Sequence, residues 1–259
     1  MRTSFEEQYI AFETIVRREI TRFTRIWTQT LLPPVITQTL YFVIFGKFIG
    51  SRIGEIQGVS YMAFIVPGLV MMAVINSAFA NVVSSFFSVK FQRSIEELLV
   101  SPASNTAIIF GFVLGGVIRG ILVGFIVFLV SIFFTRPTIH HGEIIVIFIL
   151  LTSLVFSLAG LINAIFAKKF DDVSIFPTFV LTPLTYLGGV FYSIHSLPEI
   201  WQKISMLNPI LYMVNGFRYG FYGLSDVSVW QSVLFLLGLS GVLTYANFYL
   251  LKKGTGIKS

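Results

Sequence analysis

Cysteine is absent from this 259-residue chain, and charged residues are scarce. The lack of cysteine excludes disulfides, thiolate nucleophiles and cysteine-ligated zinc. Asp, Glu, Lys and Arg make up only 12% of the residues, whereas an ordinary globular protein carries about 25%. Apolar residues account for 55%, and 28 residues are phenylalanine. This composition excludes a soluble domain and indicates that lipid is the main solvent of the protein.

Long stretches without any charged residue follow one another along the chain. A helix that crosses a bilayer needs about 20 mostly apolar residues. The stretch after Arg119 is too short to cross alone, and no turn separates it from the stretch before, so we join the two into one helix from about Asn105 to Phe134. The sequence then predicts an all-α membrane protein with six transmembrane helices in a single domain, residues 1–259. The stretches are Ile26–Gly46, Ile56–Val89, Leu98–Ile118, Gly120–Thr135, Ile144–Ala167, Val173–Pro198 and Val227–Leu251.

Lys and Arg are unevenly distributed between the two sets of connecting loops. With the N-terminus in the cytoplasm, twelve of them lie inside and five outside, Arg119 being uncounted. Because cytoplasmic loops carry an excess of Lys and Arg, both termini are predicted to be cytoplasmic. The first apolar stretch begins late, at residue 26, and lacks a small-residue cleavage site, which argues against a cleavable signal peptide.

The N-terminal segment, residues 1–27, has the clearest periodicity in the chain. Its apolar residues fall within an arc of about 80° on a helix of 100° per residue, which predicts an amphipathic helix on the inner membrane surface. The helix either anchors on anionic lipid or also docks a cytoplasmic partner through its basic face. The apolar residues are Phe5, Tyr9, Phe12, Val16, Ile20, Phe23 and Trp27, and the basic ones are Arg17, Arg18, Arg22 and Arg25.

A second polar helix is predicted in the inner loop of residues 90–103. Ser94 and Glu97 have the spacing of a capping box, and Pro102 ends the helix after about two turns. The helix is either a simple turn between two spans or a contact surface that offers Arg93, Glu96 and Glu97 to a groove on another protein.

Arg119 is the one ionisable residue well inside a predicted span. Such groups are costly in lipid and usually face the interior of the bundle. Arg119 either pairs structurally, with Asp or Glu at a membrane edge or with backbone carbonyls, or acts directly in transport. Its neighbours form overlapping small-xxx-small patterns that let another helix approach closely. These neighbours are Gly111, Gly115, Gly116, Gly120 and Gly124.

The outer segment of residues 195–226 is apolar but interrupted by Pro198, Pro209 and Gly216. It is therefore predicted to form two short helices that dip into the outer leaflet as a re-entrant element. Backbone at membrane depth is tolerated only where protein buries it, so this element should pack on the bundle.

The sequence lacks the residues that several other functions need. All three histidines fall on the outer side, and no Asp or Glu lies deep in a span, which argues against a proton-driven carrier or an intramembrane protease. His140, His141 and Glu143 are too close in sequence to close a metal site alone, so no metal is expected. The tail has Ile257 where a phosphate-binding loop needs glycine, so the chain should not bind ATP. Despite a formal charge of +6, basic residues do not cluster with aromatics on a soluble face, so no nucleic acid is expected.

Two motifs carry a resemblance to a known family. The stretch from Pro183 to Gly220 is similar to the G-G-V-F-Y…L-P…N-P…Y…R segment of the ABC-2 type transporter permeases, and Gln92–Pro102 looks like their coupling helix. The first match rests on Gly188, Gly189, Phe191, Tyr192, Leu197, Pro198, Asn208, Pro209, Tyr212 and Arg218, and the second on Arg93, Ser94, Ile95, Glu96, Glu97, Leu98 and Pro102.

The resemblance implies a permease subunit of an ATP-binding cassette exporter in the bacterial inner membrane. It implies a homodimer of this chain with two copies of a separate ATPase, which binds ATP and Mg²⁺, so this chain itself is not an enzyme. The cargo would be an amphipathic, lipid-linked or drug-like molecule that leaves the cytoplasm or the inner leaflet. The alternative is a membrane channel or scaffold that uses no ATP.

Overall fold

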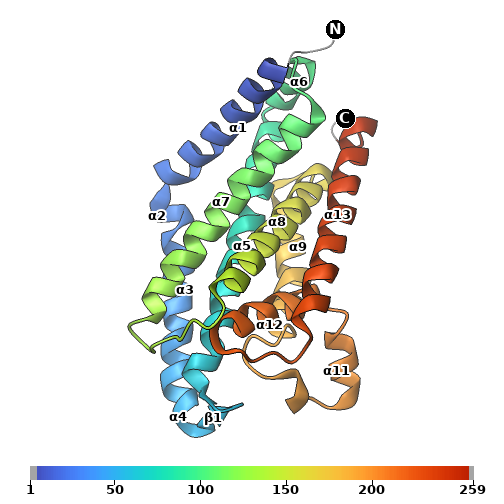
Figure 1. Cartoon of the computed structure of the whole chain (residues 1–259). Coiled ribbons are helices and arrows are strands. Elements are labelled where there is room, and N and C mark those ends of the chain that lie inside the picture. The colour runs from blue at the N-terminus through green and yellow to red at the C-terminus, as the bar shows by residue number, and fades with distance from the viewer. Residues whose placement is uncertain (1–4, 257–259) are drawn as a thin grey trace.

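Helices run along the length of the molecule in the computed structural model, which describes residues 5–256 apart from the side chain of Leu99 (Figure 1). Residues 1–4 of the predicted N-terminal helix, and Lys258, lie outside this range. Five helical runs are long and apolar enough to cross a membrane, so the prediction of an all-α membrane protein is confirmed. They are Trp27–Ile53, α5 (Tyr61–Phe91), α7 (Asn105–Ser131), α8 (Gly142–Phe166) and α13 (Val229–Lys253).

The first of these runs is interrupted near its start. Pro33 and Pro34 cannot donate backbone hydrogen bonds, and the helix restarts at Leu32 after a break at Leu31. Its helical part also continues beyond the predicted end at Gly46, as far as Ile53. The run comprises α2 (Trp27–Thr30), α3 (Leu32–Tyr41), the π-helix η1 (Phe42–Ile49) and α4 (Gly50–Ile53).

A small antiparallel hairpin, β1 (Glu55–Ile56) and β2 (Val59–Ser60), connects α4 to α5. Its two turn residues, Gln57 and Gly58, have φ values of 52° and 80°, the left-handed conformations that tight hairpins need. The predicted second span begins at Ile56, but the hairpin occupies its first residues and the chain becomes helical only at Tyr61.

The predicted fifth span is shorter than expected. Its helical part consists of α9 (Phe170–Phe176), the π-helix η2 (Pro177–Leu181) and α10 (Thr182–Tyr186), which are contiguous. At 1.5 Å per residue these segments extend about 25 Å, less than the hydrocarbon thickness of about 30 Å. The expectation of a span through to Pro198 is wrong, because the chain turns after Tyr186 and Gly189 adopts a φ of 72°.

The outer segment forms helices, as predicted. A 3₁₀ turn, η3 (Ile194–Ser196), precedes α11 (Glu199–Ser205) and α12 (Pro209–Tyr222). The second helix, α12, crosses one end of the bundle and packs on α5, α8 and α13 (Figure 1). The expectation of packing on the bundle is therefore confirmed for α12, whereas the re-entrant placement stays a prediction.

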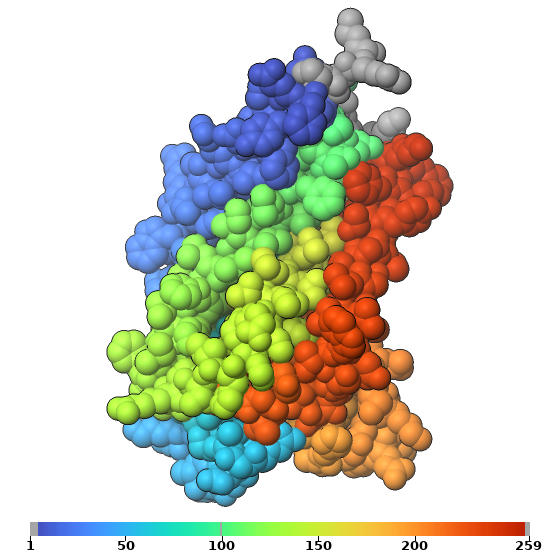
Figure 2. All heavy atoms as spheres, viewed as in Figure 1, coloured from blue at the N-terminus to red at the C-terminus, as the bar shows by residue number. Residues whose placement is uncertain are grey.

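α5 lies at the centre of the bundle, with α7 and α8 packed along it. The helix α1 (Phe5–Arg25) follows α7, as the blue and green surfaces in Figure 2 show, while α13 lies along the opposite edge of this face. A Cβ atom at Gly111 would lie 2.7 Å from Cγ2 of Ile15, and one at Gly115 would lie 2.5 Å from Cβ of Glu19. The predicted close approach of another helix to these glycines is therefore confirmed, and the approaching helix is α1.

Candidate functional site

The short helix α6 (Ser94–Val100) lies at the end of the bundle where α7 begins and α13 ends (Figure 1). Ile95 is buried among the core residues, and Leu98 packs against the same core. Glu96 and Glu97 are exposed, and Val100 is 85% exposed. One face of α6 thus anchors the helix to the bundle, while the other presents two carboxylates and an apolar side chain to the outside.

The start of α6 differs from the prediction. Arg93, not Ser94, occupies the N-cap position, and no side chain caps the helix, so the predicted capping box is absent. The physical reason is the tight connection from α5. Only Gln92 and Arg93 separate the two helices, and Arg93 has a φ of 59°, which leaves Ser94 already in the first helical turn. The helix ends before Pro102, as expected.

A side chain of α1 joins that helix to the loop after α6. Nε2 of Gln8 donates to the carbonyl oxygen of Pro102 at 2.6 Å, and Oε1 of Gln8 accepts from the backbone N–H of Ser104 at 2.6 Å. The N-terminal helix and the predicted coupling loop are therefore in direct contact.

The buried face of α1 differs from the predicted apolar stripe. Its buried residues are Ile15, Glu19 and Phe23, whereas Phe5 and Tyr9 at the start of the stripe are exposed. At 100° per residue the buried face is rotated by about 60° from the centre of the stripe. Placement of this helix on the membrane surface stays a prediction.

A cluster of polar side chains lies beneath this face. Glu19 is fully buried and accepts hydrogen bonds from Oγ of Ser85, from Nη2 of Arg22 at 3.1 Å and from Nδ2 of Asn81 at 3.5 Å. Arg22 also donates to the backbone and side-chain oxygens of Asn81, at 3.0 and 2.9 Å. Because Gly115 of α7 has no side chain, Glu19 of α1 can reach α5 across it. The sequence contains one indication of this cluster. Glu19 lies one helical turn after the apolar Ile15, so both residues fall on the same face of α1.

The four arginines of α1 are not equivalent. Arg22 is committed to the buried cluster. Arg17 forms an exposed pair with Glu13 at 3.1 Å, and the guanidinium of Arg18 lies 5.3 Å from the centre of the Phe112 ring. Arg25 is exposed. Arg17 and Arg25 are thus the members of the predicted basic face that point away from the bundle.

Arg119 has a backbone partner. Its Nη2 donates to the carbonyl oxygen of Thr30 at 2.9 Å. In a continuous helix that carbonyl would accept from the residue four positions later, which is Pro34 and has no N–H. Arg119 supplies the missing donor, so of the pairings left open by the sequence the structure shows the one with a backbone carbonyl.

Asn208 and Arg218 of the outer motif complete the hydrogen bonds of the turn after α10. Nδ2 of Asn208 donates to the carbonyl of Leu184 at 2.6 Å, and its Oδ1 caps α12. Nη2 of the buried Arg218 donates to the carbonyl of Gly189 at 2.7 Å. The guanidinium also lies 3.8 Å from the centre of the Phe64 ring. Carbonyls at helix ends need such donors, and these two side chains join the turn to α12.

The other residues of this motif also hold the outer element together. Phe191 packs between the rings of Phe45 and Tyr186, and the hydroxyl of Tyr192 donates to the carbonyl of Tyr186 at 3.0 Å. Partial burial raises the pKa of the Tyr192 phenol above its ordinary value. The remaining members pack or begin helices: Gly188 against Ile210, Pro198 at the N-cap of α11, Pro209 as the first residue of α12, and Tyr212 stacked on Phe235.

Asp226 is a buried acid that the sequence analysis did not single out. Its buried carboxylate accepts from Nε2 of Gln57 at 2.8 Å, Oγ of Ser193 at 2.9 Å and the N–H of Ile194 at 2.9 Å. It thereby joins the hairpin, the turn after α10 and the start of α13. Within residues 5–256 no group of three His, Asp or Glu side chains could hold a metal ion.

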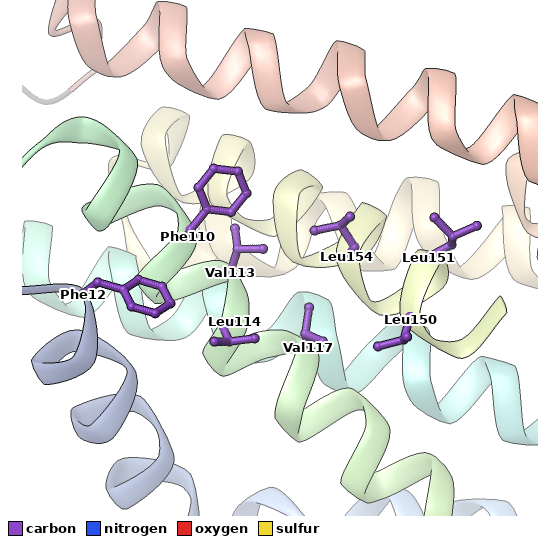
Figure 3. A pocket seen from close by; sticks show the side chains of 8 residues that line it. All are labelled: Phe12, Phe110, Val113, Leu114, Val117, Leu150, Leu151 and Leu154. Atoms are coloured by element: carbon purple, nitrogen blue, oxygen red, sulfur yellow. The ribbon is translucent and has the colours of Figure 1, made fainter. Parts of the chain in front are cut away.

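An apolar groove of about 420 Å³ lies between α1, α7 and α8, away from both motifs (Figure 3). A hydrocarbon lining makes favourable contacts with any lipid tail, so the groove by itself does not select a cargo. It is lined by Phe12, Phe110, Val113, Leu114, Val117, Leu150, Leu151 and Leu154.

Comparison with known proteins agrees with these motifs. Residues 10–222 match the ABC-2 type transporter family. The chain is 55% identical over 251 residues to the inner membrane transport permease YadH of Escherichia coli K12, covering 97% of this chain and 98% of that relative, and the Shigella flexneri protein matches equally. It is 26% identical over 177 residues to nodulation protein J of Sinorhizobium fredii, covering 67% of this chain and 66% of the relative. The chain therefore belongs to the ABC-2 type transporter family, as a multi-pass transport permease subunit of the inner membrane.

Proposed function

We propose that this chain is the permease subunit of an exporter driven by ATP hydrolysis on a separate ATP-binding cassette subunit. The observation that carries the proposal is the construction of α6. Its buried Ile95 anchors it to the core, and its exposed Glu96 and Glu97 are available to a partner. Because α6 connects α5 to α7, a partner that moves α6 also moves the two helices at the centre of the bundle.

The proposed orientation places the α6 end of the bundle in the cytoplasm. The excess of Lys and Arg in the inner loops supports it. The start of α1 and the end of α13 lie at that same end, which requires an even number of crossings (Figure 1). Five long helical runs are present, so we assign the sixth crossing to α9–α10, and α11 and α12 to a re-entrant element on the outer side.

The proposed assembly contains two copies of this chain and two cassette subunits, which bind ATP and Mg²⁺. Buried charges among the described residues, those of Glu19, Arg119, Arg218 and Asp226, are committed to hydrogen bonds within the protein. They do not form a carboxylate relay, which favours an energy source outside the chain. The family resemblance supports an amphipathic, lipid-linked or drug-like cargo that moves outward.

Co-purification with a candidate cassette subunit tests the proposal. The complex, reconstituted into sealed vesicles, should hydrolyse ATP and move cargo, and mass spectrometry should identify the molecule that accompanies it. Replacing ATP by a non-hydrolysable analogue should stop transport. Flux through vesicles that contain this chain alone, at the rate of the complex, would instead support a channel.

A further inference from the structure

A cavity of about 760 Å³ lies beneath α6, at the proposed cytoplasmic end. The ends of α5 and α8 and the chain after α13 form its other walls. Its lining combines cations with aromatic rings: Lys90, Arg93 and Lys168 beside Phe87, Phe91 and Phe166, with Ile95, Glu96, Thr255 and Gly256 completing the wall.

The cations of this cavity are available to an anion. Nζ of Lys90 donates to the carbonyls of Ile165 and Ala167, at 2.6 and 2.7 Å. These bonds fix the ammonium at the end of α8 and leave its third N–H for a ligand. The salt bridges of the described residues include neither Lys90 nor Arg93 nor Lys168. The lining carries three cations and one acid, Glu96, while the carboxylate of Asp172 lies next to it and accepts from the backbone N–H of Lys168 at 2.8 Å. Cations therefore outnumber acids at the cavity.

The aromatic wall gives the cavity a second, apolar character. Phe91 and Phe166 are 58% and 54% exposed although they lie beside the cations. The ring of Phe170 lies 4.7 Å from that of Phe91 and extends this apolar surface. A ligand that fits both parts has an anionic group next to a hydrocarbon part.

We propose that this cavity binds the phosphate headgroup of an anionic phospholipid from the cytoplasmic leaflet, with the acyl chains along Phe91 and Phe166. Basic pockets between transmembrane helices on the cytoplasmic side suit such headgroups. An acidic protein segment would use the cations but would leave the exposed rings without a partner. The proposal rests on the proposed orientation. Since Arg93 precedes α6 and Lys168 follows α8, the bound lipid holds the coupling helix against α8.

Native mass spectrometry of the purified full chain tests the proposal without any cassette subunit. The chain is titrated with phosphatidylglycerol or, as a neutral comparison, phosphatidylcholine. The double variant Arg93→Asn, Lys168→Gln should bind phosphatidylglycerol more weakly, by about fivefold for each charge removed. Asn is chosen for position 93 because it tolerates the left-handed backbone. Lys169→Gln is the matched control, because this exposed neighbour does not line the cavity.

A third variant distinguishes a lipid from free phosphate. Phe91→Ser should weaken phosphatidylglycerol binding. Inorganic phosphate should compete for the cations of the cavity as well as it does in the wild type. Equal phosphatidylglycerol binding by the wild type and the double variant would overturn the proposal. If the double variant keeps its lipid binding but loses binding to the cassette subunit in a separate pull-down, the cations serve a protein contact and the proposal is overturned. Because lipid binding is measured on this chain alone, failure of the lipid site is distinguishable from failure of the exporter function.

Discussion

α1 and α6 lie at the same end of the molecule and both carry charged side chains, yet they use them in opposite ways. The central charges of α1, Glu19 and Arg22, turn inward and bond to Asn81 of α5. The acids of α6, Glu96 and Glu97, turn outward, and the helix is anchored by an apolar residue instead.

The difference shows which charges hold the bundle together and which are free to bind. A buried charge whose partner is removed is strongly destabilising, whereas an exposed charge contributes little to stability. Arg119 and Arg218 belong with the buried group, because Arg119 donates to the carbonyl of Thr30 in α2 and Arg218 to the carbonyl of Gly189 in the turn after α10. The comparison predicts a graded series of effects on the free energy of unfolding.

Glu19→Ala should have the largest effect. It leaves Arg22 without its acid and Ser85 without an acceptor, and we expect a loss of about 2–3 kcal/mol, at the low end for a buried pair because Arg22 is 30% exposed. Thermal unfolding of the purified chain in detergent measures it. Glu19→Gln keeps most of the hydrogen bonds and should lose less. If Glu19→Ala melts at the same temperature as the wild type, buried charge does not hold α1 on the bundle.

Arg218→Leu should come next, at the opposite end of the molecule. The carbonyl of Gly189 loses its charged donor, which costs about 2 kcal/mol. The same unfolding measurement applies, together with protease sensitivity of the segment around Gly189. Arg136→Leu is the matched control, since this arginine is exposed. If both variants unfold alike, the outer motif does not depend on the buried guanidinium.

Arg119→Leu should cost about 1 kcal/mol, because one interhelical hydrogen bond within a membrane is lost. A double-mutant cycle with Pro34→Ala tests the reason. The alanine N–H can pair with the carbonyl of Thr30, so Arg119→Leu should cost less in the Pro34→Ala background than in the wild type. Additive effects of the two substitutions would contradict the assignment of this carbonyl as the partner.

Glu96→Lys combined with Glu97→Lys should leave the free energy of unfolding nearly unchanged, because both side chains are exposed. The variant should instead lose cassette binding or ATP-driven transport in vesicles. Glu199→Lys, an exposed charge reversal on α11, is the control at the other end. Normal transport by the α6 variant would contradict the coupling role of this helix.

Local patterns predicted the features that depend on neighbouring residues. The helix through Arg119 is continuous from Asn105 to Ser131, and the outer segment contains two short helices, because hydropathy and proline positions act within a few residues. The same reasoning failed at Ser94, where the tight connection through Arg93 overrides a favourable capping sequence. It also placed the end of the fifth span too late, since the turn after Tyr186 contains no charge to mark it.

The polar clusters could not be predicted, because their members are distant in the chain. Glu19 bonds to Asn81, 62 residues away, and Gln57 to Asp226, 169 residues away. Glu19, Gln57 and Asp226 look like ordinary surface positions, and Asn81 looks like an isolated polar residue in a span, until the partner is known. The single clue for Glu19, its helical alignment with Ile15, does not name the helix that receives it.

The sequence by itself determined that this is a membrane protein, where most of its helices lie and which family motifs it carries, because these depend on the local balance of apolar and charged residues. Only the tertiary structure decided which charges are free. Burial and hydrogen bonding depend on the helices that pack together, so Arg22 becomes part of the scaffold while Glu96 and Glu97 remain available on the surface.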